Sequence, residues 1–278
     1  MKSNRSPTPG PNSTSRPPTR SKSGWALAEL ALASRERREI EPLTDTWPEL
    51  DETTAYAIQK RLVVAAATEE QTRIAGIKLG LTSVAKQKQM NVDQPIYGLL
   101  IGSRMIDEGE PLAISSLIHP KAEPEIAIVT SRDLQGPGVT ADQARDAIES
   151  ACCAMEIIDS RYKDFRFTYT DVIADNTSAA RYTISPFRVR AKELDLRTLG
   201  VVFEKNGEVV STAAGAAILG DPAAGLAWLA NKLAEHGESI PAGTVVMTGA
   251  LTDAVSIAPG DVMRVSVAQL GSLTLRCV

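Results

Sequence analysis

The stretch Glu123-Pro-Glu-Ile-Ala-Ile-Val129 decides the fold, because its last four residues form a short apolar run typical of a buried β-strand. Side chains two residues apart on a strand point to the same face. Glu123 and Glu125 therefore lie side by side, where their like charges repel unless something neutralises them. Because carboxylates are mostly solvent-exposed, a solvated sheet face is the first interpretation of this pair. A site that binds a proton, a basic side chain or a metal ion is the second.

Similar short runs surround this strand, and clusters of Pro and Gly separate them. Helical patterns occur at 25–40 and at 52–69. A third begins with a capping box at Thr140 and continues to Cys153, and a fourth follows Pro222. Because strands and helices do not alternate regularly, a doubly wound parallel fold is disfavoured. We predict an α+β fold with a mixed β-roll or barrel-like core and a small helical N-terminal part. The predicted strands are 73–79, 123–130, 154–159, 182–189, 200–205, 244–248 and 262–268.

Composition divides the chain into three parts. Residues 1–24 are rich in Ser, Pro, Arg, Thr and Gly and nearly devoid of apolar residues, which predicts a disordered tail. A transit peptide would share some of this composition, but five prolines oppose an amphipathic helix. Residues 25–72 are predicted to form a helical N-terminal segment. Residues 73–278 are predicted to form a β-rich domain that carries the active site.

Charge and cysteine content exclude several classes of protein. The net charge is −4, and the first 24 residues hold five basic residues and no acidic one, so the remainder carries −9. An acidic body argues against binding to nucleic acid. Three cysteines without a CxxC motif form neither a disulfide framework nor a thiolate zinc site. No apolar run approaches the roughly 20 residues of a membrane helix. We therefore expect a cytoplasmic protein.

A third carboxylate, Glu156, also stands inside an apolar run that predicts a strand. An acidic side chain there is costly to bury without a partner. Three carboxylates in strands suit a hard, oxygen-binding ion such as Mg²⁺ or Mn²⁺. The charge cluster that follows, which includes Asp159 and Arg161, is either a solvated turn or part of the same site.

Three further stretches could contribute to chemistry. Lys78 stands alone in an apolar strand flanked by glycines, and is either an edge lysine or a site residue. If it is partly buried, its pKa falls and it can transfer protons near neutrality. The segment Asp175-Asn-Thr-Ser178 is either a turn that caps its own backbone or a binding loop. Thr248-Gly-Ala offers a hydroxyl and backbone N–H groups to an anion, unless the glycine only marks a turn. Cys152 and Cys153 are interpreted as small core residues on the predicted helix.

Taken together, these stretches resemble the family of 2-hydroxypentadienoate hydratases and 4-oxalocrotonate decarboxylases. This family belongs to the larger fumarylacetoacetate hydrolase group. The resemblance runs from about Thr53 to the C-terminus and rests on five motifs that occur in order. They are GIKLGLTS (76–83), QPIYG (94–98), HPKAEPEIA (119–127), EIIDSRYKDF (156–165) and IADNTS (173–178).

The resemblance implies a site, and it favours the metal interpretation of the glutamates. It implies Mg²⁺ or Mn²⁺ on Glu123, Glu125 and Glu156, with Lys78 as the acid/base group. It also implies a β-rich roll that assembles into oligomers. We expect Asp159 and Arg161 to take part in catalysis. The residues expected to line the substrate are Ile96, Asp175, Asn176, Ser178 and Thr248.

The branch within the family is decided by single positions. Hydratases of this family more often have Asp where Ile96 stands, which favours a decarboxylase. In contrast, Ala at position 250 is the residue type expected of a hydratase, since decarboxylases tend to have Gly at this position. We predict metal-dependent decarboxylation of 2-oxo-3-hexenedioate (4-oxalocrotonate) to 2-hydroxypenta-2,4-dienoate in aromatic meta-cleavage catabolism.

Two alternatives stay open. One is a 2-keto-4-pentenoate hydratase that adds water to 2-hydroxypenta-2,4-dienoate. The other is an inactive scaffold partner of such an enzyme, although a scaffold needs neither the carboxylate trio nor Lys78. The expected partners are a small 2-oxo acid substrate and further copies of the chain. The resemblance also implies a complex with a pathway hydratase, because related decarboxylases and hydratases associate.

Overall fold

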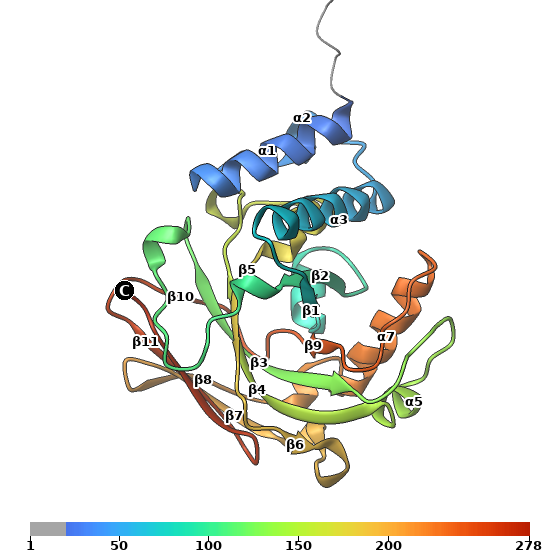
Figure 1. Ribbon diagram of the computed structural model, residues 1–278, viewed down its shortest axis with the longest axis vertical. Coiled ribbons are helices and arrows are strands. Elements are labelled where there is room, and N and C mark those ends of the chain that lie inside the picture. The colour runs from blue at the N-terminus through green and yellow to red at the C-terminus, as the bar shows by residue number, and fades with distance from the viewer. Residues whose placement is uncertain (1–20) are drawn as a thin grey trace, which may run out of the picture.

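The computed structural model describes residues 21–278, and the predicted disordered tail lies outside these residues except for its last four. Of these, residues 22–24 are helical, because α1 begins at Lys22, where the Ser21 side chain accepts a hydrogen bond from the N–H of Gly24. Three helices form a layer at the N-terminal end of the molecule (Figure 1). They are α1 (Lys22–Glu36), α2 (Leu43–Thr46) and α3 (Glu52–Glu69).

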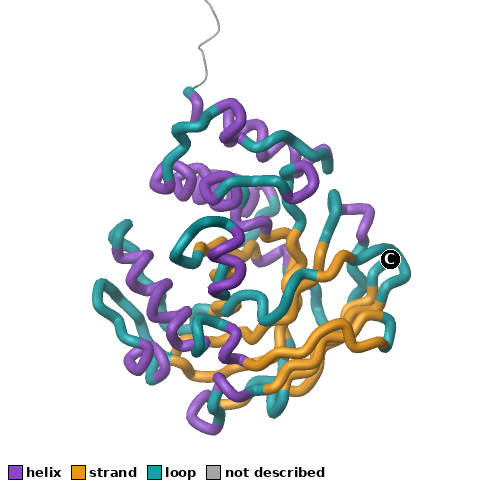
Figure 2. Tube along the Cα trace, turned by 180° about the vertical axis from the view of Figure 1, so that it is seen from behind, coloured by secondary structure: helices purple, strands orange, loops and turns teal. Residues whose placement is uncertain are grey.

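Two β-sheets lie together below this helical layer, as the view from behind shows (Figure 2). The larger sheet has eight strands, with the order β2-β1-β9-β3-β4-β5, while β10 pairs with β3 and β6 pairs with β4. The smaller sheet has the order β12-β11-β7-β8. The strands are β1 (Ile74–Gly80), β2 (Ile96–Ile101), β3 (Lys121–Thr130), β4 (Ile148–Ile158), β5 (Ala179–Ile184), β6 (Val189–Arg190), β7 (Gly200–Lys205), β8 (Glu208–Ala214), β9 (Val245–Met247), β10 (Val255–Ser256), β11 (Val262–Val267) and β12 (Gly271–Arg276).

The antiparallel pair β3–β4 forms the centre of the larger sheet. The two strands pair along their length, from Lys121 opposite Ile158 to Thr130 opposite Ile148. Nearly every residue of both strands is buried. Strands that are covered on both faces have continuous apolar sequences rather than alternating ones, which explains the run that ends at Val129.

The larger sheet curls into a half-barrel. Past the end of β2, Met105 forms a bridge with Tyr182 of β5, and the N–H of Ile106 donates to the carbonyl of Tyr182. These contacts connect the segment after β2 with β5, and β2 and β5 are the two end strands in the order β2-β1-β9-β3-β4-β5. The α+β fold with a rolled β-core is confirmed.

The described residues form four further α-helices, and two of them, α5 and α7, lie together at one side of the sheet (Figure 1). The helix α5 begins with the predicted capping box at Thr140, but it ends at Arg145. The prediction that this helix continues to Cys153 is wrong, because residues 148–158 pair with β3. Pairing across the sheet outweighs the local spacing of apolar residues, which suits either structure. The bounds are α4 (Val84–Gln89), α5 (Ala141–Arg145), α6 (Tyr169–Ala174) and α7 (Pro222–Ala234).

None of the helices within residues 21–278 has the length and apolar character that crossing a membrane requires.

Candidate metal centre

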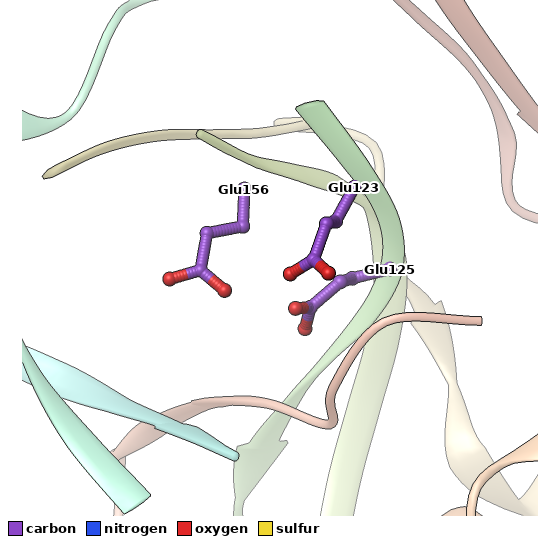
Figure 3. A group of neighbouring side chains, drawn as sticks. All are labelled: Glu123, Glu125 and Glu156. Carbon is purple, nitrogen blue, oxygen red and sulfur yellow. The ribbon is translucent and has the colours of Figure 1, made fainter. Parts of the chain in front are cut away.

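Three carboxylates converge at one end of the β3–β4 pair (Figure 3). Glu123 and Glu125 lie on the same face of β3, and Glu156 lies directly opposite Glu123 on β4. Each residue offers an oxygen atom, and these oxygen atoms all lie within 4.8 Å of one another. All three side chains are buried, and Glu125 and Glu156 have no exposed surface. The solvated sheet face that the sequence left open is therefore excluded.

The hydrogen bonding of these carboxylates fits a bound cation. Within the described chain, Oε1 of Glu125 and both carboxylate oxygens of Glu156 are buried and have no hydrogen-bond donor. The other oxygen of Glu125, Oε2, accepts from the N–H of Gly249 at 2.8 Å. Buried anionic oxygens without donors are costly, and a hard divalent cation satisfies them. A donor set made only of carboxylate oxygens suits Mg²⁺ or Mn²⁺.

Lys78 lies beside the three carboxylates. Its Nζ is 2.9 Å from Oε2 of Glu156, although the two groups are not aligned for a hydrogen bond. It donates a hydrogen bond to the backbone carbonyl of Thr177 at 3.1 Å. On the paired strands Lys78 stands opposite Gly98 of β2 and Met247 of β9. The register thus carries Lys78 onto the carboxylate-bearing face of the sheet, since Met247 is in turn opposite Ala127, two residues from Glu125.

Burial and like charge shift the pKa values of this cluster. Burial, only partly offset by Lys78, raises the pKa of Glu156 to about 7. Burial and the neighbouring Glu156 raise the pKa of Glu125 well above its usual range. Burial alone would lower the pKa of Lys78, but the three carboxylates outweigh it and raise that pKa. The predicted net fall in the pKa of Lys78 is therefore wrong, although burial does act in that direction, and in the metal-free protein the side chain holds its proton at neutral pH.

We expect the metal-free protein to lose stability as pH rises from roughly 5 to 8. The folded state keeps the proton of Glu156 up to pH about 7, whereas the unfolded chain releases it near 4.5. The stabilising contribution is fully present below the lower value and is lost as pH rises through the upper one. We expect a fall in Tm of roughly 5 °C in EDTA. Mg²⁺ at high pH should reverse it, because a ligand of the folded state stabilises it.

Calorimetry across this pH range, in EDTA and in Mg²⁺, measures this effect. The variant Glu156→Gln is the control, because it removes one titrating group and should make the slope in EDTA shallower, while Glu125 and Asp175, whose pKa values are also raised, still contribute. A wild-type Tm in EDTA that rises with pH would contradict the assignment.

A second lysine, Lys86, lies at the rim of the site on α4. Its Nζ is 3.2 Å from Oε1 of Glu123 and 3.3 Å from the carbonyl oxygen of Thr252. About a quarter of the side chain is exposed, whereas Lys78 is buried. Lys86 could not be predicted as a site residue, because the sequence of its short polar helix resembles that of any solvated turn.

Asp159, Arg161 and Asp175 form a neighbouring buried cluster. The guanidinium of Arg161 donates to the carboxylate of Asp175, and the carboxylate of Asp159 accepts from the N–H groups of Ile118 and His119. Burial, partly offset by Arg161, raises the pKa of Asp175 to about 6. Among the described residues, the side chains of these three bond to loops and to one another rather than to the three glutamates.

The remaining predicted site residues lie close to Lys78 or to Glu125. Asn176 and Ser178 belong to the turn whose carbonyl accepts from Lys78, and the hydroxyl of Ser178 has no partner among the described residues. Ile96 pairs with Gly80, two residues from Lys78. The hydroxyl of Thr248 donates to the carbonyl of Ile126, and the next residue bonds to Glu125.

Comparisons with known proteins identify the family of the chain. The family described as "Fumarylacetoacetate (FAA) hydrolase C-terminal" matches residues 67–278. The chain is 46% identical over 254 residues to a 4-oxalocrotonate decarboxylase of Pseudomonas putida, covering 91% of this chain and 96% of that one. It is 39% identical over 246 residues to a 2-keto-4-pentenoate hydratase of Burkholderia vietnamiensis, covering 88% and 94%.

A solved structure is similar along almost the whole chain. It is the 4-oxalocrotonate decarboxylase from Pseudomonas putida G7, complexed with magnesium and adipate. The TM-score is 0.90 at 42% sequence identity, and the match covers 95% of this chain and 100% of that one. The chain therefore belongs to the fumarylacetoacetate hydrolase family, and within it to the group of 4-oxalocrotonate decarboxylases and 2-keto-4-pentenoate hydratases.

Proposed function

We propose that this enzyme is a lyase that decarboxylates 2-oxo-3-hexenedioate to 2-hydroxypenta-2,4-dienoate and CO₂, a step in the catabolism of aromatic compounds. The observation that carries the proposal is the buried carboxylate trio beside the buried amino group of Lys78. The 46% identity to a 4-oxalocrotonate decarboxylase favours this reaction over hydration, for which the relative quoted above is 39% identical. Adipate, bound in the similar structure, is a six-carbon dicarboxylate like the proposed substrate.

The chemistry assigns a task to each part of the site. A divalent cation on Glu123, Glu125 and Glu156 would supply Lewis acidity, which withdraws electrons from the 2-oxo acid. The bond between C5 and C6 of the substrate breaks, and the C6 carboxylate leaves as CO₂. Its electron pair forms the C4–C5 double bond, while the former C3–C4 double bond shifts to C2–C3. Lys78 donates its proton to the oxygen on C2, which gives the dienol product.

We propose that Ile96, Ser178 and Thr248 line the substrate. The hydroxyl of Ser178, which has no partner within residues 21–278, could bond a substrate oxygen in this proposal. Asp159, Arg161 and Asp175 contribute differently in this proposal, because their charged groups hold the loops around the site. Their replacement would disturb the shape of the site rather than remove a reacting group.

The test uses the purified protein with Mg²⁺ and two substrates. With 2-oxo-3-hexenedioate we expect release of CO₂ that EDTA abolishes and Mg²⁺ restores. With 2-hydroxypenta-2,4-dienoate we expect hydration to be slower by a factor of at least about 100, which corresponds to roughly 3 kcal/mol in the barrier. Faster hydration than decarboxylation would reverse the assignment. Failure of both reactions would favour the inactive scaffold partner.

We expect Ile96→Asp to lower kcat/KM for decarboxylation by about tenfold, or roughly 1.4 kcal/mol. Ile96 is buried on the strand that pairs with the one carrying Lys78. An apolar neighbour leaves the departing carboxylate poorly solvated, whereas an added carboxylate repels it. Ile96→Leu is the matched control, because it keeps the apolar surface and should change the rate by less than about twofold. An unchanged rate in Ile96→Asp would remove Ile96 from the specificity of the site.

We further propose that the enzyme acts in the cytoplasm as a homo-oligomer, in a complex with the hydratase that consumes its product. The three cysteines are buried and unpaired, which fits a reducing compartment. Size-exclusion chromatography with and without such a hydratase tests the assembly. A monomer that elutes separately from the hydratase would contradict it.

A further inference from the structure

Three consecutive residues beside Lys78 have an unusual backbone. Asn176, Thr177 and Ser178 have φ angles of 52°, 54° and 56°, and all three are buried. L-amino acids other than glycine rarely adopt this left-handed conformation, and then mostly as single residues. A run of three persists only where the surrounding structure determines it, and such sites cluster at functional positions.

Side chains of the turn fasten it to β2. Oδ1 of Asn176 accepts from the N–H of Leu99 at 2.8 Å, and its Nδ2 donates to the carbonyl of Leu99 at 2.9 Å. The hydroxyl of Thr177 donates to the carbonyl of Tyr97 at 2.9 Å. These three bonds lie on both sides of Gly98. The amide of Asn176 thus takes the place of a neighbouring strand and fixes where the turn lies.

Two glycines leave room for this close approach. A Cβ atom on Gly98 would lie 2.8 Å from the carbonyl oxygen of Asn176, and one on Gly80 would lie 2.7 Å from Cγ2 of Thr177. Cβ atoms in proteins essentially never lie this close to another heavy atom, so a side chain at either position would clash with the turn. The strand that carries Lys78, β1, and its neighbour β2 therefore lack side chains at the points where the turn packs against them.

The turn ends at the acid/base lysine. The carbonyl of Thr177 accepts a hydrogen bond from Nζ of Lys78 at 3.1 Å, while Glu156 lies 2.9 Å from Nζ on another strand. The amide of Asn176 uses one N–H and one oxygen lone pair on the backbone of Leu99, so β2 fixes its orientation. We propose that Asn176 is a positioning residue that acts through the Thr177 carbonyl to aim the ammonium group of Lys78.

This inference rests on the role of Lys78 in the proposed function, and it replaces substrate contact as the role of Asn176. Asn176→Ala removes both bonds to Leu99. We expect kcat for decarboxylation to fall on the order of tenfold to a hundredfold, since small displacements of a reacting group have effects of this size. KM and the Kd for Mg²⁺, measured by calorimetry, should stay within about twofold, because no ligand contact is lost.

Conservative variants separate positioning from general damage. Asn176→Asp keeps the acceptor for the N–H of Leu99 and should recover part of kcat, whereas Asn176→Gly relieves the backbone but lacks the amide and should not. Asn206 provides the matched control: its φ is 56°, its Nδ2 donates to Asp261 and its Oδ1 accepts from the N–H of Val262. Asn206→Ala removes a similar pair of side-chain hydrogen bonds, in the turn between β7 and β8, and should leave kcat unchanged.

A measurement without turnover keeps the inference separate from the proposed function. Acylation of lysines in the metal-free protein, mapped by mass spectrometry, should label Lys78 at least about fivefold faster in Asn176→Ala than in wild type, because the ammonium is no longer held. Buried Lys232 is the internal reference and should not change. If wild type lacks decarboxylase activity but this labelling pattern holds, the proposed function fails and the positioning role stands. Equal labelling of Lys78 in both proteins, or a KM effect in place of the kcat effect, would overturn the inference.

Discussion

Glu125→Gln is expected to lower decarboxylation by at least about a thousandfold and to abolish stabilisation by Mg²⁺. Glu125 has no exposed surface, and one of its oxygens has no donor among the described residues. The amide keeps the shape of the side chain and can still accept from the N–H of Gly249. It lacks the negative charge that a divalent cation requires of this position. The effect is therefore on the charge of the site rather than on its packing.

The same substitution should make the metal-free protein more stable than wild type near pH 8. Gln carries no charge, so the cost of burying the Glu125 carboxylate, and the repulsion from Glu156 that helps to raise its pKa, both disappear. Thermal unfolding with and without saturating Mg²⁺ measures both effects at once. Glu149→Gln, at an exposed position on β4, is the matched control and should respond to Mg²⁺ as wild type does. Activity of Glu125→Gln that survives EDTA would remove the metal from the proposal.

The metal ligands show what strand spacing can and cannot predict. Alternation along β3 places Glu123 and Glu125 on one face from the sequence alone. Glu156 is 31 positions further along the chain, and only the register of β3 with β4 brings it opposite Glu123. Without that register, a solvated pair of glutamates was the better physical interpretation. The five ordered motifs supplied the link that spacing could not.

The fold was predicted best where apolar runs are long and least well where packing overrides local pattern. The helix over 52–69 is confirmed with these bounds. Strands β2, β8, β10 and β12 were not predicted. Of these, β8 is largely exposed and β12 alternates between exposed and buried residues at the edges of the smaller sheet, so neither has a strong apolar run. β2 lies in the motif around Ile96, where Gly98 weakens the signal of a strand.

The left-handed turn was beyond the reach of sequence reasoning. Asp175-Asn-Thr-Ser178 has the composition of an ordinary turn, and only Asn among its middle residues is common at positive φ. The conformation is set by partners about 80 residues away along the chain, such as Tyr97 and Leu99. The direction in which the pKa of Lys78 shifts could not be predicted for a similar reason. It depends on three carboxylates gathered from two other strands.

Lys78→Met is expected to lower kcat for decarboxylation by a factor on the order of 10² to 10⁴, the usual contribution of a positioned proton donor. Methionine fills a similar volume but has no proton to give to the oxygen on C2 of the substrate. Mg²⁺ should bind at least as tightly as in wild type, because the substitution removes a cation that lies 2.9 Å from Glu156. Decarboxylation and Mg²⁺ affinity should therefore change independently, which a defect in folding would not produce.

Lys232→Met provides the matched control for this prediction, because Lys232 is also buried and paired with carboxylates, those of Glu52 and Glu235. Its loss should reduce stability while kcat stays within about twofold of wild type, since no reacting atom is involved. The decisive measurement is single-turnover release of CO₂ with Mg²⁺ saturating each variant. If Lys78→Met released CO₂ at the wild-type rate, proton transfer would have to come from another group, and the positioning role of Asn176 would lose its target. A rate that falls in Lys78→Met and not in Lys232→Met follows only if the proton on Lys78 takes part in the reaction.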